Sequence, residues 1–408
     1  MGVSAFLLVT NARLVTPAGL REGAVAVSGG RIAQIGSVSL DAEETVNARG
    51  KLLIPGLIDC GVFAIDKPAF HFGGITRAAL MPDQAPPLDL PSRVAYVAKS
   101  GKPDFWVHPL AAATRELAGD RLSELALMQM EGAKGIATGR GWIADSGVML
   151  RLLRYAAMLD LPVFAHAEDA AIVGQAVASD GEIATRLGLP SAPSQAEALA
   201  IARDLRLAEM AGAHIHFRQV TTREGLEMVR LAKANGVRVT AGVTPAHVLL
   251  SDLAVAEFRS FMRLSPPLRS EDDRQAVLEA LSDGTIDIVS SGHDPRGPEE
   301  KRLPFADAEP GMAGAQTLLA LVLGLVRDDV VTLERAVALV TANPARLLGV
   351  DAGVLAEGAE ADLALVDPDK PWVVRSDQMA ASANNTPFDG QGVQGRVLRL
   401  WKGGVSVF

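Results

Sequence analysis

Short apolar runs alternate with amphipathic segments through the middle of the chain, and this alternation constrains the fold more than any other feature. Runs such as AKGIATG, LPVFAHAED and VRVTAGVTP have the length and β-branched content of buried strands. Most precede segments such as REGLEMVRLAKANG, in which apolar residues recur every three or four positions. Repeated β–α units form a parallel sheet, and their number predicts an α/β fold, a TIM-like (β/α)8 barrel over residues 55–349.

The two ends of the chain have a different character. Residues 1–54 and 350–408 contain β-branched runs interrupted by Asn, Gly and Pro, such as SAFLLVTNARLVTP and GRVLRLWKGGVSVF. Such runs are typical of short strands joined by turns. Because both ends share this pattern, we expect them to assemble into one small composite β-sandwich domain beside the barrel.

The first unit of the expected barrel is shorter than the others. About ten residues, IDKPAFHF among them, separate the strand-like runs GLIDCGVF and GGITRAALMP. A parallel crossover needs a dozen or more residues, usually with a helix, and this segment contains Pro68. We therefore expect the barrel to lack its first outer helix. Either Phe70 and Phe72 fold inward over the uncovered wall, or the segment lies at a subunit interface.

Composition and charge exclude several classes of protein. The sequence is 49% hydrophobic, enough for a large aliphatic core, and its net charge of −9 without a basic tract argues against binding nucleic acid. The apolar run near the start is too short for a secretory leader or a membrane span. Cys60 is the only cysteine, so no disulfide forms within the chain. We expect a cytoplasmic protein that does not insert into membranes.

Polar residues that follow the strand-like runs are the first candidates for a functional site. Barrels of this kind place their chemistry at the carboxyl ends of the strands. The residues found there are His166, Glu168, Gln219, Thr244, His247 and His293.

A series of motifs, taken in order, resembles the dihydroorotases of the amidohydrolase superfamily. The motifs are PGLID, GGIT with MPD, HAED, TPAHVLLSD, SPPLRSEDDR, GHDPR, GMAGAQT, NPARLLG, EGAEADLALVDP and NTPFDG with GRVLRLWKGG. Each alone is a weak signal, but together they cover nearly the whole chain. The fold of that family, a (β/α)8 barrel with a composite β-sandwich from both ends, agrees with the fold expected from the patterning.

The resemblance implies a zinc site whose ligands are largely missing. Active family members hold zinc with an HxH pair on the first strand, an acidic bridging group on the fourth, a histidine each on the fifth and sixth, and an aspartate on the eighth. That aspartate also acts as the general base. At these positions the chain has Gly61 and Phe63, Gly139 followed by Arg140, His166, Gln219, and Gly292.

Only His166 is retained from that ligand set. A catalytic zinc needs at least three protein ligands, and activating a water needs both the metal and a base. We therefore expect no metal, no other cofactor and no catalytic residue, since Gly292 occupies the general-base position.

The positions that bind the anionic substrate in family members have changed as well. The resemblance implies an arginine, two asparagines and a histidine at positions that here are Ile65, Asp83, Ser265 and Arg296. A carboxylate at position 83 repels an anion, whereas Arg296 attracts one.

Other arrangements of ligands remain open. His214 and His216 form an HxH pair, but if Gln219 faces the pocket, strand alternation directs both histidines toward the helices. Cys60 has no base beside it in the sequence and is expected in the core. A weak mononuclear site would draw on His166, His247 and His293, with Glu168 or Asp169.

Together, the resemblance and the substitutions imply a catalytically inactive dihydroorotase-like protein of de novo pyrimidine biosynthesis. Non-catalytic bacterial homologues imply a structural partner of aspartate transcarbamoylase, within an oligomer. Two alternatives remain: an active dihydroorotase with an atypical or mononuclear zinc site, and a protein that binds an acidic ligand through Arg140 or Arg296. The vestigial pocket is expected to comprise His166, Glu168, Gln219, His247, His293, Arg296, Arg140, Asp83 and Ser265.

Overall fold

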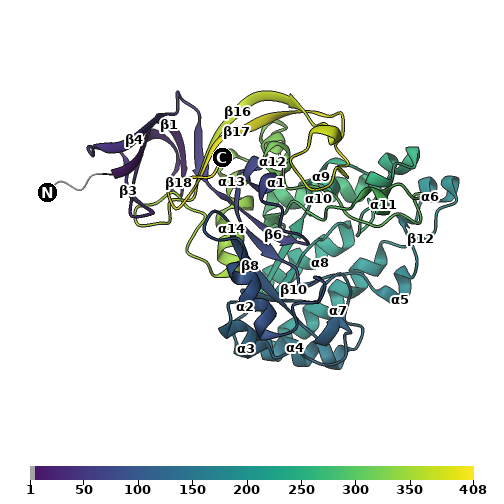
Figure 1. The fold of residues 1–408 in the computed structure, drawn as a ribbon. Coiled ribbons are helices and arrows are strands. Elements are labelled where there is room, and N and C mark those ends of the chain that lie inside the picture. Colours follow the sequence, from purple (N-terminus) through teal and green to yellow (C-terminus); the bar gives the residue numbers. More distant parts are fainter. Residues whose placement is uncertain (1–4) are drawn as a thin grey trace.

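Eight parallel strands form the centre of the protein in the computed structural model, which describes residues 5–408 (Figure 1). Their order in the sheet follows their order in the chain, so each strand pairs with the next. This confirms the predicted (β/α)8 barrel. The strands are β6 (Leu57–Val62), β7 (Ile75–Leu80), β8 (Trp106–Ala112), β9 (Gly135–Ala137), β10 (Val163–Ala165), β13 (Ile215–Phe217), β14 (Val239–Val243) and β15 (Ile288–Val289).

Helices follow the strands and cover the barrel from outside. The main ones are α2 (Pro91–Ser100), α3 (Leu125–Met130), α4 (Ser146–Met158), α7 (Gln195–Ala211), α8 (Arg223–Ala234), α10 (Glu271–Asp283), α12 (Leu318–Arg327), α13 (Leu333–Val340) and α14 (Ala342–Leu348). Smaller elements lie in the loops: α5 (Ala170–Val173), α6 (Glu182–Leu187), α9 (Pro245–Leu249), α11 (Pro298–Lys301), and the pair β11 (Ala178–Ser179) and β12 (Ser191–Ala192). Four 3-10 turns add Arg115–Leu117, Asp252–Glu257, Ser260–Met262 and Ser376–Gln378. Within the described residues, no helix is both long and apolar enough to cross a bilayer.

A short helix, α1 (Lys67–Phe72), lies between β6 and β7. Pro68 stands in its first turn, where a missing N–H costs nothing, so the proline does not break the helix. The expectation that this unit has no outer helix is therefore wrong. Phe70 is fully buried and stacks on Phe105 with ring centroids 4.9 Å apart. Of the two expected alternatives, an inward fold and a subunit interface, Phe70 therefore follows the inward fold.

The ends of the chain join in one mixed sheet beside the barrel (Figure 1). It contains β1 (Ala5–Thr16), β2 (Gly19–Ser28), β3 (Arg31–Gly36), β4 (Ala42–Asn47), β5 (Leu52–Pro55), β16 (Leu363–Val373), β17 (Gly392–Lys402) and β18 (Val405–Ser406). Backbone bonds from Ile32 to Ala359 and from Gly404 to Ala361 draw the β3 side of this sheet toward its C-terminal strands. The sheet thereby curls around its own core, which includes Leu7, Val27 and Trp401.

The barrel interior below its mouth is filled with apolar side chains. Ile58 and Cys60 of β6 pack there with Phe164 of β10, and α14 contributes Leu348. Cys60 is buried, and burial raises its thiol pKa, so this thiol behaves as a small core side chain.

Asp59 closes the gap between the first and last barrel strands. Its carboxylate accepts a hydrogen bond from the Ser291 backbone N–H at 2.9 Å and another from the Ser291 hydroxyl. Nearby, the Phe63 N–H donates to the His293 carbonyl at 2.9 Å. Burial raises the pKa of Asp59 to about 6, although the bonds from Ser291 lower it.

The Asp59→Asn variant is expected to gain stability over the wild type as the pH rises from about 4 to 7. The folded-state pKa of about 6 exceeds the ordinary value of 3.8, so the protonated carboxyl is favoured in the folded state. Its stabilising contribution is complete below pH 4 and is lost as the pH rises through 6. An amide keeps one acceptor and gains a donor for Ser291 without a charge. The shift corresponds to at most about 3 kcal/mol.

Chemical unfolding of both proteins at pH 4 and pH 7 measures this effect. The difference in free energy of unfolding between variant and wild type should be larger at pH 7. An equal difference at both pH values would contradict the assignment to Asp59.

Candidate functional site at the barrel mouth

A cavity of about 110 Å³ opens at the carboxyl ends of the barrel strands. It collects side chains from five of the eight strand–loop units, those of β6, β9, β13, β14 and β15. The lining residues are Phe63, Arg140, Arg218, Gln219, Thr244, His247, Leu264, Ser265, Gly292, Asp294, Pro310, Gly311 and Met312.

Gly61 leaves room for an arginine where the resemblance implies a zinc ligand. Its φ of +84° is a conformation that favours glycine, and a Cβ added there would lie 3.1 Å from Cδ of Arg218. A histidine at position 61 would therefore be strained and would collide with Arg218.

Phe63 takes the second position of the implied HxH pair and lies between two cations. The guanidinium of Arg140 is 3.7 Å from its ring centroid, and that of Arg218 is 5.1 Å away. Both distances are within the range of attraction between a cation and an aromatic face. Two positive charges thus occupy the region in which the resemblance implies a zinc site.

Arg140 is neutralised within the site. It forms a bidentate ion pair with Asp294, with Nη1–Oδ2 and Nη2–Oδ1 distances of 2.6 and 2.9 Å. Its backbone N–H donates to Oδ1 of Asp83 at 2.8 Å. A Cβ at Gly139 would lie 2.9 Å from that same oxygen. Asp83 therefore supports the loop that carries Arg140 and does not line the cavity.

Gly292, at the general-base position, is closely surrounded. It has a φ of +62°, and a Cβ there would lie 2.7 Å from Cε of Met312 and 2.9 Å from Cγ2 of Thr244. An aspartate at this position would need both neighbours to move.

The sixth strand corrects the prediction for the histidine pair. Gln219 lines the cavity, as expected, but Ile215 and Phe217 pack among the helices and His216 points into the barrel interior against Phe164. His214 lies on the same side of β13 as His216, because both histidines form hydrogen bonds with the Thr240 hydroxyl, at 3.2 and 3.0 Å.

The physical reason is that β13 ends at Phe217. The alternation of side chains stops there, so Arg218 and Gln219 both reach the mouth. His214 and His216 still do not line the cavity, since they lie below it.

His166 and Glu168 lie behind the cavity, in a buried polar network. Nδ1 of His166 is 3.5 Å from Nη2 of Arg218, and its Nε2 is 3.4 Å from the Glu168 carboxylate. Glu168 also pairs with Arg269 at 2.7 Å. Burial raises the pKa of Glu168, but the bond with His166 and the charge of Arg269 outweigh it and lower the pKa to about 2. This glutamate is a structural anion at neutral pH.

His247 lines the cavity but both of its ring nitrogens are engaged. Nε2 donates to the Pro266 carbonyl at 3.0 Å, so Nδ1 accepts from the Thr244 hydroxyl at 2.8 Å. Burial lowers its pKa to about 4. A neutral ring held in this way has no free lone pair for a metal.

His293 lies outside the cavity, contrary to the expected cluster of histidines. It is fully buried, and its ring packs against Phe70 of α1 at a centroid distance of 5.2 Å. Burial lowers its pKa to about 4. The backbone after β15 turns this side chain toward α1, so it cannot join His166 and His247 in a metal site.

Arg296 also lies outside the cavity, and Ser265 is exposed at its rim. The guanidinium of Arg296 is bonded to Glu300 at 2.9 Å, to the Pro310 carbonyl at 3.1 Å and to Asp294 at 3.3 Å. Its donors are already occupied by the protein.

Two charged residues that line the cavity, Arg218 and Asp294, were not among the site residues expected from the sequence. Burial and the positive charge of Arg140 lower the pKa of Arg218 to about 10. An arginine directly after an apolar strand and directly before Gln219 was the available signal.

The residues of the mouth do not fit the metal that the resemblance implies. Across residues 5–408, no group of three or more His, Cys, Asp or Glu side chains is placed to hold an ion. Gly61 and Phe63, at the ligand positions of the first strand, have no metal-binding atom in their side chains. The guanidiniums of Arg140 and Arg218 bring positive charge to the same region, which repels a cation. No hydrolytic step through a metal can be derived from these side chains.

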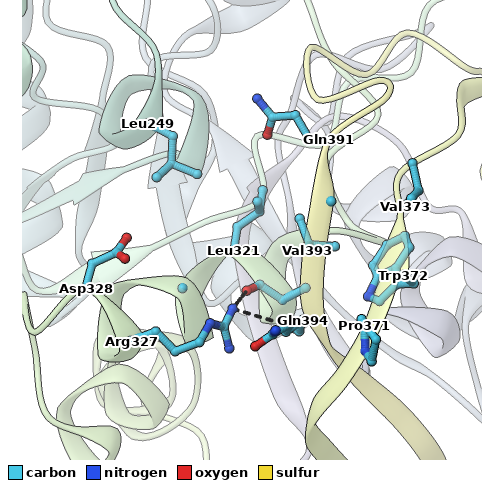
Figure 2. Close-up of a pocket in the computed structure, with 13 residues that line it drawn as sticks. Leu249, Leu321, Arg327, Asp328, Pro371, Trp372, Val373, Gln391, Val393 and Gln394 are labelled. Atoms are coloured by element: carbon cyan, nitrogen blue, oxygen red, sulfur yellow. Dashed lines mark hydrogen bonds between the residues drawn. The ribbon is translucent and has the colours of Figure 1, made fainter.

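A larger, shallower groove lies on another face, beside the long β16–β17 hairpin (Figure 2). Trp372, Val393 and Leu321 form its apolar wall, and Figure 2 shows Arg327 turned toward the backbone of the hairpin. Arg327 bonds the Gln394 carbonyl at 3.2 Å. This groove carries no cluster of groups suited to chemistry.

Comparisons with known proteins agree on the family. A profile described as "Amidohydrolase family" matches residues 86–407. The dihydroorotase of Syntrophotalea carbinolica is 36% identical, covering 96% of each chain, and that of Pelotomaculum thermopropionicum is 37% identical, covering 95% of each.

Solved structures show the same fold. The L-hydantoinase (dihydropyrimidinase) of Arthrobacter aurescens superposes with a TM-score of 0.89 at 25% identity, over 99% of this chain and 96% of that one. A D-hydantoinase (dihydropyrimidinase) of Thermus sp. has a TM-score of 0.82 at 22% identity, over 98% and 94% of the two chains.

Proposed function

Because this chain belongs to the amidohydrolase family, we propose that it is a dihydroorotase-like protein of pyrimidine biosynthesis that does not hydrolyse dihydroorotate. The family usually binds metal. The observation that carries the proposal is the occupation of the ligand region by Phe63 between the guanidiniums of Arg140 and Arg218. With no metal and no base at Gly292, the site has no means of activating water.

The barrel frame remains intact although the ligands are replaced, which supports a structural role. We infer that this role is to hold aspartate transcarbamoylase in a cytoplasmic assembly, as the resemblance to non-catalytic homologues implies. The neighbouring helices α2, α3 and α4 offer a surface, since Tyr96, Met130 and Met158 are 77%, 81% and 83% exposed. A partner that covers these three helices would bury all three side chains, and methionine adapts readily to a partner.

An active dihydroorotase is the second candidate, favoured by the names of the curated relatives. It would need an atypical or mononuclear zinc site made from groups other than those at the mouth. A turnover assay in both directions, with zinc added, separates the two candidates. Our proposal expects no hydrolysis of dihydroorotate and no cyclisation of N-carbamoyl-aspartate above the uncatalysed rate.

Co-expression with the transcarbamoylase tests the structural role. The two chains should elute together in size-exclusion chromatography, and Met130→Glu with Met158→Glu should separate them. The matched control is Met210→Glu on α7, which is 58% exposed on another helix and should leave assembly intact. Separate elution of the unaltered proteins would overturn the proposed partner, and an unaffected double variant would move the interface elsewhere.

A further inference from the structure

Arg218 is a buried cation without a counter-charge. Its side chain is buried, with 6% of the residue exposed, and Nε has no hydrogen-bond partner. Its one polar contact is the long one, 3.5 Å, to Nδ1 of His166. No carboxylate within residues 5–408 forms an ion pair with it; Asp83, Asp294 and Glu168 act on its pKa only from a distance. Burying a charge in this way is costly unless an opposite charge is close.

The cavity beside Arg218 carries one excess positive charge. Of the two guanidiniums that line it, that of Arg140 is cancelled by Asp294, and the charge of Arg218 remains. Arg296, which the sequence suggested as an anion ligand, is engaged by Glu300 and Asp294 outside the cavity.

The rest of the lining suits a small acidic group. Gln219 has a buried amide oxygen without a partner, and rotating this amide by a half-turn would present its NH₂ there instead. Ser265 supplies a hydroxyl at the rim, while Phe63 and Met312 form apolar walls. A cavity of about 110 Å³ holds several water molecules or one small oxyanion, but no nucleotide.

We propose that the barrel mouth binds a small oxyanion, a carboxylate or phosphate group on a compact molecule, through Arg218 and Gln219. The planar guanidinium is matched to such groups, because it donates two parallel hydrogen bonds to two oxygens. The site is independent of the transcarbamoylase assembly proposed above and is available in the isolated chain.

Calorimetric titration of the purified chain in an anion-poor buffer tests the site, with acetate, inorganic phosphate and neutral acetamide as probes. Acetate or phosphate should bind saturably and acetamide should not; the stronger of the two anions identifies the chemical class. Arg218→Met should weaken binding roughly tenfold to a hundredfold, because charge-assisted hydrogen bonds usually contribute this much to affinity. Absence of saturable binding by either anion overturns the proposal.

Two further variants guard against misfolding as an explanation. Arg396→Met is the matched control, since this half-buried arginine stacks over Phe72 at 4.1 Å and lies outside the cavity. It should bind the anion with wild-type affinity. Gln219→Glu supplies a carboxylate of nearly the same size inside the cavity, so it should abolish anion binding while the protein stays folded. Wild-type affinity in Arg218→Met or in Gln219→Glu overturns the assignment.

Discussion

Replacing Arg269 with methionine is expected to lower the free energy of unfolding by about 3–5 kcal/mol, because it leaves buried carboxylates without their cation. The guanidinium pairs with Glu168 at 2.7 Å and with Glu197 at 3.4 Å, and it donates to the Thr221 hydroxyl at 3.0 Å. Glu197 is fully buried and also accepts hydrogen bonds from the backbone of Thr221 and Thr222. These contacts join α7, the start of α8 and the loop before α10.

Arg223→Met is the matched control for this variant. Arg223 also bonds two acidic side chains, Asp272 and Glu279, but their side chains are 73% and 60% exposed. Exposed pairs contribute at most about 1 kcal/mol, so the control should unfold almost like the wild type. Urea unfolding of the three proteins decides the matter, and a loss below about 1 kcal/mol for Arg269→Met would show that the buried network does not hold these elements together.

Restoring the missing histidine pair is expected to harm the protein without restoring catalysis. In the Gly61→His, Phe63→His double variant, a side chain is forced into a left-handed backbone conformation against Arg218, and the ring between two guanidiniums is lost. Together these changes should cost at least about 3 kcal/mol. Dihydroorotate should not be hydrolysed, because Gln219 and Gly292 still lack a ligand and a base.

Gly119→His separates backbone strain from collision in this experiment. Gly119 has a φ of +79° but nothing within 4 Å of an added Cβ, so only the strain of about 1–3 kcal/mol applies. Thermal unfolding and a zinc-supplemented turnover assay are the measurements. Hydrolysis by the double variant would mean that the barrel positions have been assigned in the wrong register.

Patterns that depend on neighbours in the chain were predictable. The apolar runs LPVFAHAED and VRVTAGVTP became β10 and β14, and REGLEMVRLAKANG became α8, because periodicity reports which side chains are buried. That both ends contribute strands to one small β domain followed in the same way from their β-branched runs. The short helix α1 is not predictable from the length of its segment or from Pro68, because this proline stands in the first turn, where it does not interrupt the helix.

The arrangement of the mouth was less predictable, because it depends on pairs far apart in the chain. Asp294 neutralises Arg140 across 154 positions, and Arg269 meets Glu168 across 101. Strand alternation counted back from Gln219 put His214 and His216 on the wrong side, because β13 ends at Phe217 and Gln219 no longer follows the alternation that leads from His216 to Arg218. The position of His293 after β15 predicts that it lies at the mouth, but the turn there directs its ring toward Phe70.

Elemental analysis of the metal content is the most direct test of the central claim that this barrel has exchanged its metal site for a pair of arginines. The chain would be produced with excess zinc, purified without chelator and dialysed against metal-free buffer. We predict well below one equivalent of zinc per chain, because Arg140 and Arg218 occupy the ligand region and His247 has both nitrogens engaged. One or two zinc ions retained per chain would contradict the account.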